Sequence, residues 1–366
     1  MIRPSLVAAL LATVSLAACG APDPKTQAVA PNAPTEQPTP AGATGALSAR
    51  SIEAAVWQPT PAASASPSTA AQPTAPGADP ATPAATTPPR PEIIRAQILL
   101  DRARFSPGAI DGLGGENTRQ AVAAFAKANG LQSDGDLNAE VFAKLTHAAA
   151  PVTTQYTITA ADVAGPFAPV PEGLEAQAEL TALNYASPLE GLAEKFHVTE
   201  ALLTALNPGA DFARAGQTIV VPAISAQPLP AAVTRILVSK ADSAVRAFGA
   251  DGTLLAFYPA TIGSSSRPAP TGRLTVVGVA PEPNYTYDPD RLTYGTADRK
   301  FVVAAGPNNP VGAVWIDLSR DTYGIHGTPD PSKIAKTASN GCVRLTNWSA
   351  EQLAASVKPG VEVIFS

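Results

Sequence analysis

Two motifs near the C-terminal end contain residue types that can carry out nucleophilic chemistry. Ser339–Leu345 (SNGCVRL) holds Cys342, one of only two cysteines in the chain, and Tyr323–Pro329 (YGIHGTP) holds His326. A thiol attacks as its thiolate and needs a neighbouring base to take its proton. His326 is the one histidine of residues 233–366, so a base from the same domain must be His326. We therefore predict a thiolate–imidazolium pair at neutral pH; a buried structural cysteine is the alternative.

The second cysteine, Cys19, closes a predicted export signal at residues 1–19. The run Ser5–Leu16 is mostly apolar and is too short to span a bilayer, which takes about 20 apolar residues. The ending Leu16-Ala17-Ala18-Cys19 resembles a bacterial lipobox, which implies lipidation of Cys19; an ordinary signal cut nearby is the alternative. Gly20, where inner-membrane lipoproteins often carry Asp, implies the outer membrane. We therefore expect a periplasmic protein with a lipid anchor.

The counts of cysteine, histidine and charged residues argue against a disulfide, a metal site and nucleic-acid binding. With Cys19 lipidated or removed, Cys342 has no partner for a disulfide within the chain. One histidine, one cysteine and no C-x-x-C spacing in the C-terminal segment do not make a metal site, and no cofactor is expected. A net charge of −5 without a block of Lys or Arg gives no reason to expect nucleic-acid binding.

Composition separates a linker from the folded regions. Residues 20–91 consist largely of Ala, Pro, Thr and Ser, with Trp57 as the aromatic exception. Such a segment buries too little apolar surface to offset the entropy lost on ordering, so we predict a disordered, semi-stiff tether. At most a weak helix is expected around Ser51–Val56.

Residues 92–148 have the pattern of a small helical domain. Ile94 and Ile98 are one helical turn apart, Asn117 is a candidate N-cap with Gln120 three residues on, and Gly130 is placed to end that helix. The helices surround a D-G-x-x-G-x-x-T motif, made of Asp111, Gly112, Gly115 and Thr118. This arrangement resembles the peptidoglycan-binding domain of cell-wall enzymes; a three-helix bundle without a ligand is the alternative.

Residues 155–223 resemble a lysin motif, the module that grips peptidoglycan glycan strands. Thr199 is the expected N-cap of a helix that stops at Asn207-Pro208, and a β-branched strand follows at residues 215–222. The departure is a long insertion between the expected first strand, Tyr156–Ile158, and the helices. A packing role is therefore an alternative to glycan binding.

The last segment, residues 233–366, changes to short β-rich runs separated by Gly, Pro and Asp turns, which predicts a mostly antiparallel sandwich or barrel. Asp251-Gly252 is a strong hairpin signal. One helix is expected from Ser349 to about Val357, opened by a Ser-x-x-Gln capping box. The expected strands are 235–238, 244–248, 254–262, 274–279, 301–303, 314–318 and 361–365.

The motif H-G-T-P at His326, a spacer and S-N-G-C-V-R-L together resemble the active-site signature of the L,D-transpeptidase catalytic domain. The resemblance implies that Cys342 attacks the third residue of a peptidoglycan stem tetrapeptide and that an amine then takes the thioester, giving 3→3 crosslinks. It also implies that the Gly327 carbonyl orients His326. Many members have a second histidine where this chain has Asn340, which leaves His326 as the one base.

The same resemblance implies roles for the residues around the nucleophile. Backbone N–H groups of Asn340, Gly341 and Cys342 are expected to hold the developing oxyanion, and glycine lets the backbone approach closely. Arg344 is expected to bind a donor carboxylate, a surface arginine being the alternative. The candidate substrate contacts are Arg344, Ser339 and Tyr323.

Peptidoglycan is the expected partner, and a membrane is reached through the lipid. Two other enzymes fit the same site: one that passes the thioester to water, as an amidase or carboxypeptidase does, and one that attaches an outer-membrane protein to the wall. A catalytically inactive lipoprotein that merely tethers the membrane to the wall is the non-enzymatic alternative.

Overall fold

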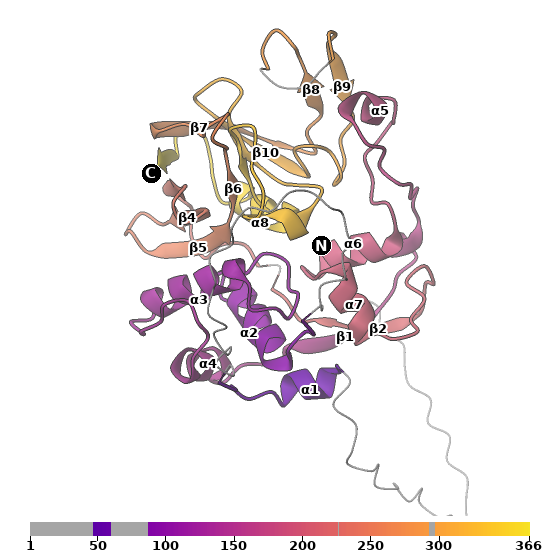
Figure 1. The fold of residues 1–366 in the computed structure, drawn as a ribbon, viewed down its shortest axis with the longest axis vertical. Coiled ribbons are helices and arrows are strands. Elements are labelled where there is room, and N and C mark those ends of the chain that lie inside the picture. The colour runs from indigo at the N-terminus through magenta and orange to yellow at the C-terminus, as the bar shows by residue number, and fades with distance from the viewer. Residues whose placement is uncertain (1–46, 60–86, 226, 293–296) are drawn as a thin grey trace, which may run out of the picture. The chain divides into compact units, whose positions relative to one another are not determined.

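The computed structural model describes residues 47–59, 87–225, 227–292 and 297–366 (Figure 1). These residues belong to one compact unit, which spans Gly45–Ser366. The predicted signal, Cys19 and most of the predicted linker lie outside the described residues. Within the described ranges, no helix has the length and apolar character needed to cross a membrane.

The predicted three-helix domain is present, as α2 (Pro91–Arg102), α3 (Glu116–Ala128) and α4 (Ala139–Thr146). Ile94 and Ile98 are fully buried, and Gly130 has the positive φ of a helix stop. The predicted N-cap is wrong: Gly115 occupies that position, and Asn117 lies in the first turn. The Asn117 side chain instead donates to the carbonyl of Ile334, in the catalytic domain, at 3.0 Å.

The prediction of a disordered linker is wrong for residues 47–59. Here a short helix, α1 (Ala49–Glu53), begins at a Ser48 capping box and buries Ile52 completely. The Trp57 indole N–H donates to the carbonyl of Leu137 at 2.9 Å, and the Glu53 carboxylate accepts from Thr153. Average composition hid these few anchoring side chains within an Ala- and Pro-rich stretch.

The lysin-motif-like module (residues 153–222) pairs β1 (Thr153–Thr157) with β2 (Thr218–Pro222) in antiparallel fashion. Between them lie α6 (Pro188–Lys195) and α7 (Glu200–Leu206), and the Thr199 side chain caps α7 as predicted. The insertion before α6 contains η1 (Ala161–Val163) and α5 (Leu174–Ala178), and α5 packs beside β9 (Phe301–Val303) of the catalytic domain (Figure 1).

The catalytic domain is mostly β, as predicted. One nine-stranded sheet has the order β5-β4-β3-β13-β7-β10-β11-β12-β6, and β8 (Tyr285–Tyr287) pairs separately with β9. Two neighbouring pairs, β3–β13 and β11–β12, are parallel. The sequence patterns missed β8, β11 and β12, which have two or three residues each. The sheet strands are β3 (Arg235–Ser239), β4 (Ala244–Phe248), β5 (Leu254–Pro259), β6 (Thr261–Ile262), β7 (Gly272–Pro281), β10 (Val314–Leu318), β11 (Gly324–His326), β12 (Val343–Arg344) and β13 (Glu362–Phe365).

The helix of this domain, α8 (Asn347–Ala354), starts two residues earlier than predicted. Thr346 is its N-cap and accepts from the backbone N–H of Ser349, so Ser349 lies in the first turn rather than at the cap. The earlier start places Asn347 inside the fold, where its side chain is almost fully buried.

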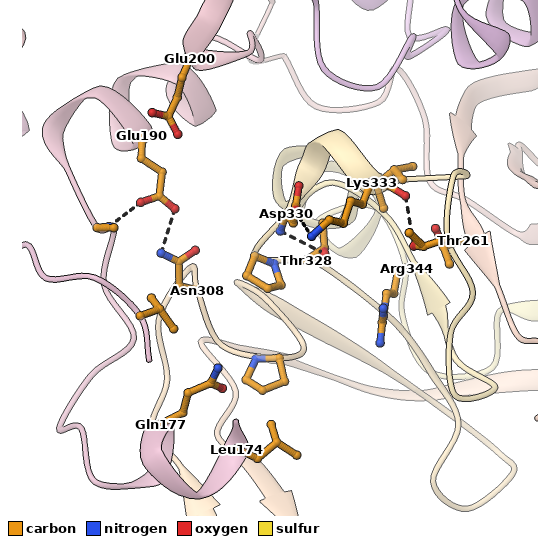
Figure 2. Close-up of a pocket in the computed structure, with 16 residues that line it drawn as sticks. Leu174, Gln177, Glu190, Glu200, Thr261, Asn308, Thr328, Asp330, Lys333 and Arg344 are labelled. Atoms are coloured by element: carbon orange, nitrogen blue, oxygen red, sulfur yellow. Dashed lines mark hydrogen bonds and ion pairs between the residues drawn. The ribbon is translucent and has the colours of Figure 1, made fainter. Parts of the chain in front are cut away.

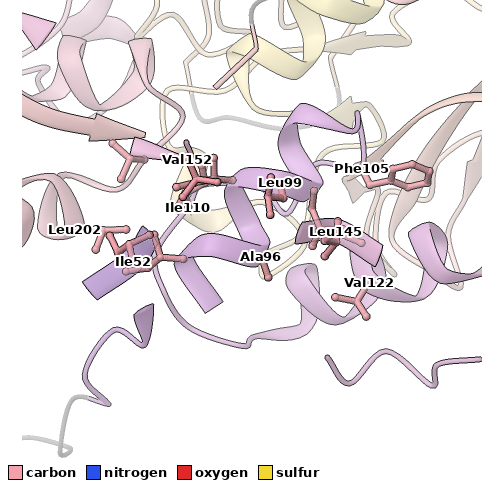
Figure 3. Packing of buried hydrophobic residues seen from close by; sticks show 14 of the residues in the cluster. Ile52, Ala96, Leu99, Phe105, Ile110, Val122, Leu145, Val152 and Leu202 are labelled. Carbon is pink, nitrogen blue, oxygen red and sulfur yellow. The ribbon is translucent and has the colours of Figure 1, made fainter. Parts of the chain in front are cut away.

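Two hydrophobic clusters hold these parts together. One lies within the catalytic domain, between the sheet and α8. The other includes residues of α1, the three-helix domain and the lysin-motif-like module, with Ile52, Ile110 and Leu202 among them (Figure 3), and reaches Phe257 in β5. The modules therefore share a core instead of folding around separate ones.

Candidate active site

Two short parallel strands bring the cysteine and the histidine of the motifs to one face of the sheet. In β11 and β12, Ile325 pairs with Val343 and His326 with Arg344. Side chains alternate along a strand, so the buried Ile325 and Val343 point to one face. His326, Arg344 and the preceding Cys342 must then share the opposite face. Core packing of the intervening residues thus fixes the orientation of the site.

The loop that carries Cys342 is held by Ser339. The buried Ser339 hydroxyl donates to the Cys342 carbonyl at 2.6 Å and accepts from the backbone N–H of Gly263 at 2.7 Å. Gly341 has φ +107°, and a Cβ there would lie 2.9 Å from the Tyr323 ring. Only glycine meets both demands at this position. Ser339 therefore braces the nucleophile loop, in addition to lining the cavity in front of it.

His326 is fixed in one tautomer and one ring orientation. Its Nδ1 lies 2.7 Å from the carbonyl oxygen of Gly327, which assigns the proton to Nδ1 and leaves Nε2 as the unprotonated ring nitrogen. The ring stacks on Trp315 of β10, with centroids 5.4 Å apart and planes inclined by 21°. A Cβ at Gly324 would lie 2.4 Å from the Trp315 ring, so a glycine makes room for this stack.

The electrostatics of the site favour neutral forms. Burial raises the pKa of the half-buried Cys342 thiol, an effect that a backbone hydrogen bond and Arg344 oppose. Burial, followed by the positive charge of Arg344, lowers the pKa of His326 to about 3. Both shifts disfavour the predicted thiolate–imidazolium pair. The hydrogen bond of Cys342 Sγ goes to the Thr322 carbonyl, at 3.5 Å.

The Cys342 thiol, His326 and Arg344 line a cavity of about 800 Å³, whose walls also include Trp315. Within the described part of the chain, no hydrogen-bond acceptor meets the backbone N–H groups of Asn340, Gly341 and Cys342. The Asn340 side chain is tied back, since its Oδ1 accepts from Arg267 at 2.6 Å.

Arg344 also lines a second cavity, of about 580 Å³. Figure 2 shows Arg344 on one side of the second cavity, with Glu190 of α6 and Glu200 of α7 across from it. Arg344 Nε is buried and has no hydrogen-bond partner among the described residues. The lysin-motif-like module therefore forms one wall of a cavity that reaches the catalytic face.

Of the predicted substrate contacts, Ser339 and Arg344 line the cavity in front of Cys342, and Tyr323 does not. The Tyr323 ring packs beside Gly341 and under Arg320, and Tyr323 does not line either cavity. Sequence reasoning missed Trp315; the alternation of strand 314–318 was the signal available, because it places Trp315 on the face opposite the buried Val314 and Ile316. Among the described residues, no group of three or more His, Cys, Asp or Glu could hold a metal ion.

A thiol, a correctly oriented imidazole, a partly buried arginine and unengaged backbone N–H groups are the components that acyl transfer through a cysteine requires. The family model for the L,D-transpeptidase catalytic domain matches residues 233–365, and that for a putative peptidoglycan-binding domain matches residues 89–145.

Relatives of known sequence agree with these matches. A putative L,D-transpeptidase of Bacillus licheniformis, YkuD, is 32% identical over 178 residues, which are 48% of this chain and 91% of that protein. The probable L,D-transpeptidase ErfK/SrfK of Escherichia coli is 31% identical over 183 residues, 48% of this chain and 58% of that protein. L,D-transpeptidase 3 of Mycobacterium tuberculosis, a solved structure, aligns at 15% identity with a TM-score of 0.31, over 42% of this chain and 74% of that one.

The chain belongs to the L,D-transpeptidase family. It is an enzyme of the acyltransferase class, and its helical domain together with its catalytic domain makes peptidoglycan its partner.

Proposed function

We propose that this enzyme crosslinks peptidoglycan through a thioester on Cys342, joining the third residues of two stem peptides. The observation that carries the proposal is the common face of β11 and β12, on which Cys342, His326 and Arg344 line one cavity. The nucleophile, the base and a cation for substrate are thereby within one site.

Acylation begins from the neutral pair. His326 Nε2 takes the thiol proton as Sγ attacks the carbonyl of the third stem residue of a tetrapeptide donor. The free N–H groups of Asn340, Gly341 and Cys342 hold the oxyanion, and removing one such donor typically costs about 2.7–4 kcal/mol. His326 then gives the proton to the departing amine of D-Ala, which leaves the thioester.

Arg344 links substrate binding to the strength of the base. Its charge lowers the pKa of His326, and its buried Nε has no hydrogen-bond partner in the described part of the chain. A donor carboxylate at Arg344 offsets that charge and makes His326 a stronger base when substrate is present. Substrate would thus relieve the smaller of the two effects that lower the pKa of His326, while burial, the larger one, remains.

The second step returns the thiol. The side-chain amine of a diaminopimelate in another stem attacks the thioester, His326 removes the amine proton, and Cys342 leaves as the thiol. The cavity lined by Glu190 and Glu200 adjoins the site and carries carboxylates that attract an ammonium group.

The test is to incubate a soluble form of the chain, lacking the first 46 residues, with a disaccharide-tetrapeptide and to identify the products by mass spectrometry. Cys342→Ala is the control. A dimer that has lost D-Ala and that depends on Cys342 supports the proposal. Loss of D-Ala with monomers alone indicates a hydrolase or an absent protein acceptor, and identical behaviour of the two proteins indicates a non-enzymatic tether.

The place of action is also a proposal. The L-A-A-C ending at Cys19 supports a lipid anchor, and the residue after it supports the outer membrane, facing the periplasm. Metabolic labelling with an alkyne fatty acid tests this: label on the wild type that is absent from Cys19→Ala is expected, and equal labelling contradicts it.

A further inference from the structure

A continuous chain of hydrogen bonds leads away from His326 and out of the catalytic domain. The Nδ1–H of His326 donates to the Gly327 carbonyl at 2.7 Å. The same peptide unit carries the N–H of Thr328, which donates to Asn347 Oδ1 at 3.0 Å. Asn347 Nδ2 in turn donates to both carboxylate oxygens of Glu194, at 3.0 and 3.2 Å. Glu194 lies in α6, within the lysin-motif-like module.

The Asn347 side chain, which links the two domains, is tightly packed. A Cβ at Gly327 would lie 2.1 Å from Asn347 Oδ1, and one at Gly312 would lie 2.2 Å from it, so glycines on two sides admit the amide. Asn347 and Glu194 are 3% and 8% exposed. Water therefore competes little for these bonds, and in such surroundings hydrogen bonds in series polarise one another.

The module is held in the position that this connection needs. The Asn308 side chain donates to the Glu190 carboxylate and to the Asn184 carbonyl, at 2.9 and 3.0 Å. The backbone of Leu183 exchanges hydrogen bonds with Ala305 and Asn308, each of 2.9 Å. The insertion that separates this module from an ordinary lysin motif is thus the segment that docks it on the catalytic domain.

We propose that Glu194 is a positioning residue for His326 and increases its basicity through Asn347 and the Gly327–Thr328 peptide. This rests on the proposed function, in which His326 is the base. An ionised Glu194 makes Asn347 Oδ1 a better acceptor, which makes the Gly327 carbonyl more negative and so holds the Nδ1 proton more firmly. The free Nε2 then accepts the thiol proton more readily.

The pKa of Glu194 lies within the pH range in which activity can be measured. Burial, together with the neighbouring carboxylates Glu190 and Glu351, raises the pKa of Glu194 to about 8, against the opposing effect of hydrogen bonds from Asn347 and the Tyr185 hydroxyl. Acylation should accordingly become faster as the pH passes through about 8. An accessory module thereby sets the pH range of the catalytic centre.

The test compares Glu194→Gln with Glu351→Gln in single-turnover acylation by the tetrapeptide, from pH 6 to 9.5. Glu194→Gln keeps an acceptor for Asn347 but loses the charge. Its rate at pH 9 should fall by roughly three- to tenfold, as for a base weaker by up to about one pKa unit, and the rise near pH 8 should vanish. Glu351→Gln removes one like charge beside Glu194, so its rise should move to lower pH.

A second measurement does not depend on turnover. In the proton NMR spectrum the His326 Nδ1–H resonance should shift as the pH passes through 8 in the wild type and stay fixed in Glu194→Gln. Unchanged rates, profile and resonance in a folded Glu194→Gln protein would overturn the proposal while leaving the function intact. Full activity of His326→Gln would instead overturn the proposed function itself.

Discussion

The catalytic motifs and the lysin-motif-like module contribute to the site in different ways. Cys342 and His326 come together because β11 pairs with β12. Each of the two residues belongs to a motif of consecutive residues. Glu194 reaches the same site only because α6 docks against α8, far along the chain. The first kind of contribution is local and can be recognised from a motif, whereas the second exists only in the assembled tertiary structure.

The largest effect is expected for His326, a residue of the local motifs. His326→Gln removes the base, and general-base catalysis typically contributes about 10²- to 10⁴-fold, so acylation of Cys342 should slow by that order. Intact-mass spectrometry of the acyl-enzyme over time measures it. A loss smaller than tenfold would mean that another group takes the thiol proton.

The stack behind His326 offers the next test. Gly324→Ala places a methyl group 2.4 Å from the Trp315 ring, so Trp315 or the strand must shift. Overpacking of this kind costs about 1–3 kcal/mol, and the acylation rate should fall with the displaced imidazole. Gly278→Ala is the matched control, because a Cβ there meets nothing within 4 Å. Equal behaviour of the two variants would show that the stack has no role.

Arg344 is tested through the substrate. Arg344→Gln should raise the KM for the tetrapeptide by about tenfold or more, since a hydrogen bond to a charged group contributes about 1.5–3 kcal/mol. A donor whose terminal carboxylate is amidated should bind wild type and variant alike. Steady-state kinetics with both donors measures this, and equal KM values for them in the wild type would argue against the assigned role.

Docking of the module can be broken without touching the motifs. Gly306 has φ +144°, and a Cβ there would lie 2.2 Å from the Leu183 carbonyl oxygen. Gly306→Ala should therefore loosen the insertion and lower acylation severalfold. Gly360→Ala, also at positive φ but with nothing within 4 Å, controls for backbone strain alone. If both variants lose activity equally, docking is not what the site requires.

A further effect is expected on stability. Because the folded pKa of Glu194 is raised to about 8, above the roughly 4.5 of an exposed Glu, the group favours folding below pH 4.5. That contribution is lost as the pH rises through about 8. Denaturant unfolding should show a decline between these values that Glu194→Gln lacks. A parallel decline in the variant would assign the titration to another group.

The sequence predicted the three helices, most strands of the catalytic sheet and the pair Cys342 and His326, because each depends on periodicity or on a local motif. It missed β11 and β12, since strands of two or three residues carry no periodic signal. It expected only a weak helix within a disordered linker where α1 lies, because the order of this segment comes from Ile52 and Trp57 packing on distant partners. Asn347 and Glu194 gave no signal at all, because their role arises from a contact between residues 153 positions apart.

The helical domain contacts the edge strand of the catalytic sheet through its backbone. The backbone of residues 104–106 pairs with Phe257, through hydrogen bonds of 2.9 Å on each side, and so covers part of β5, the edge of the sheet. A pull on the helical domain would therefore act on these two hydrogen bonds, and through them on β5.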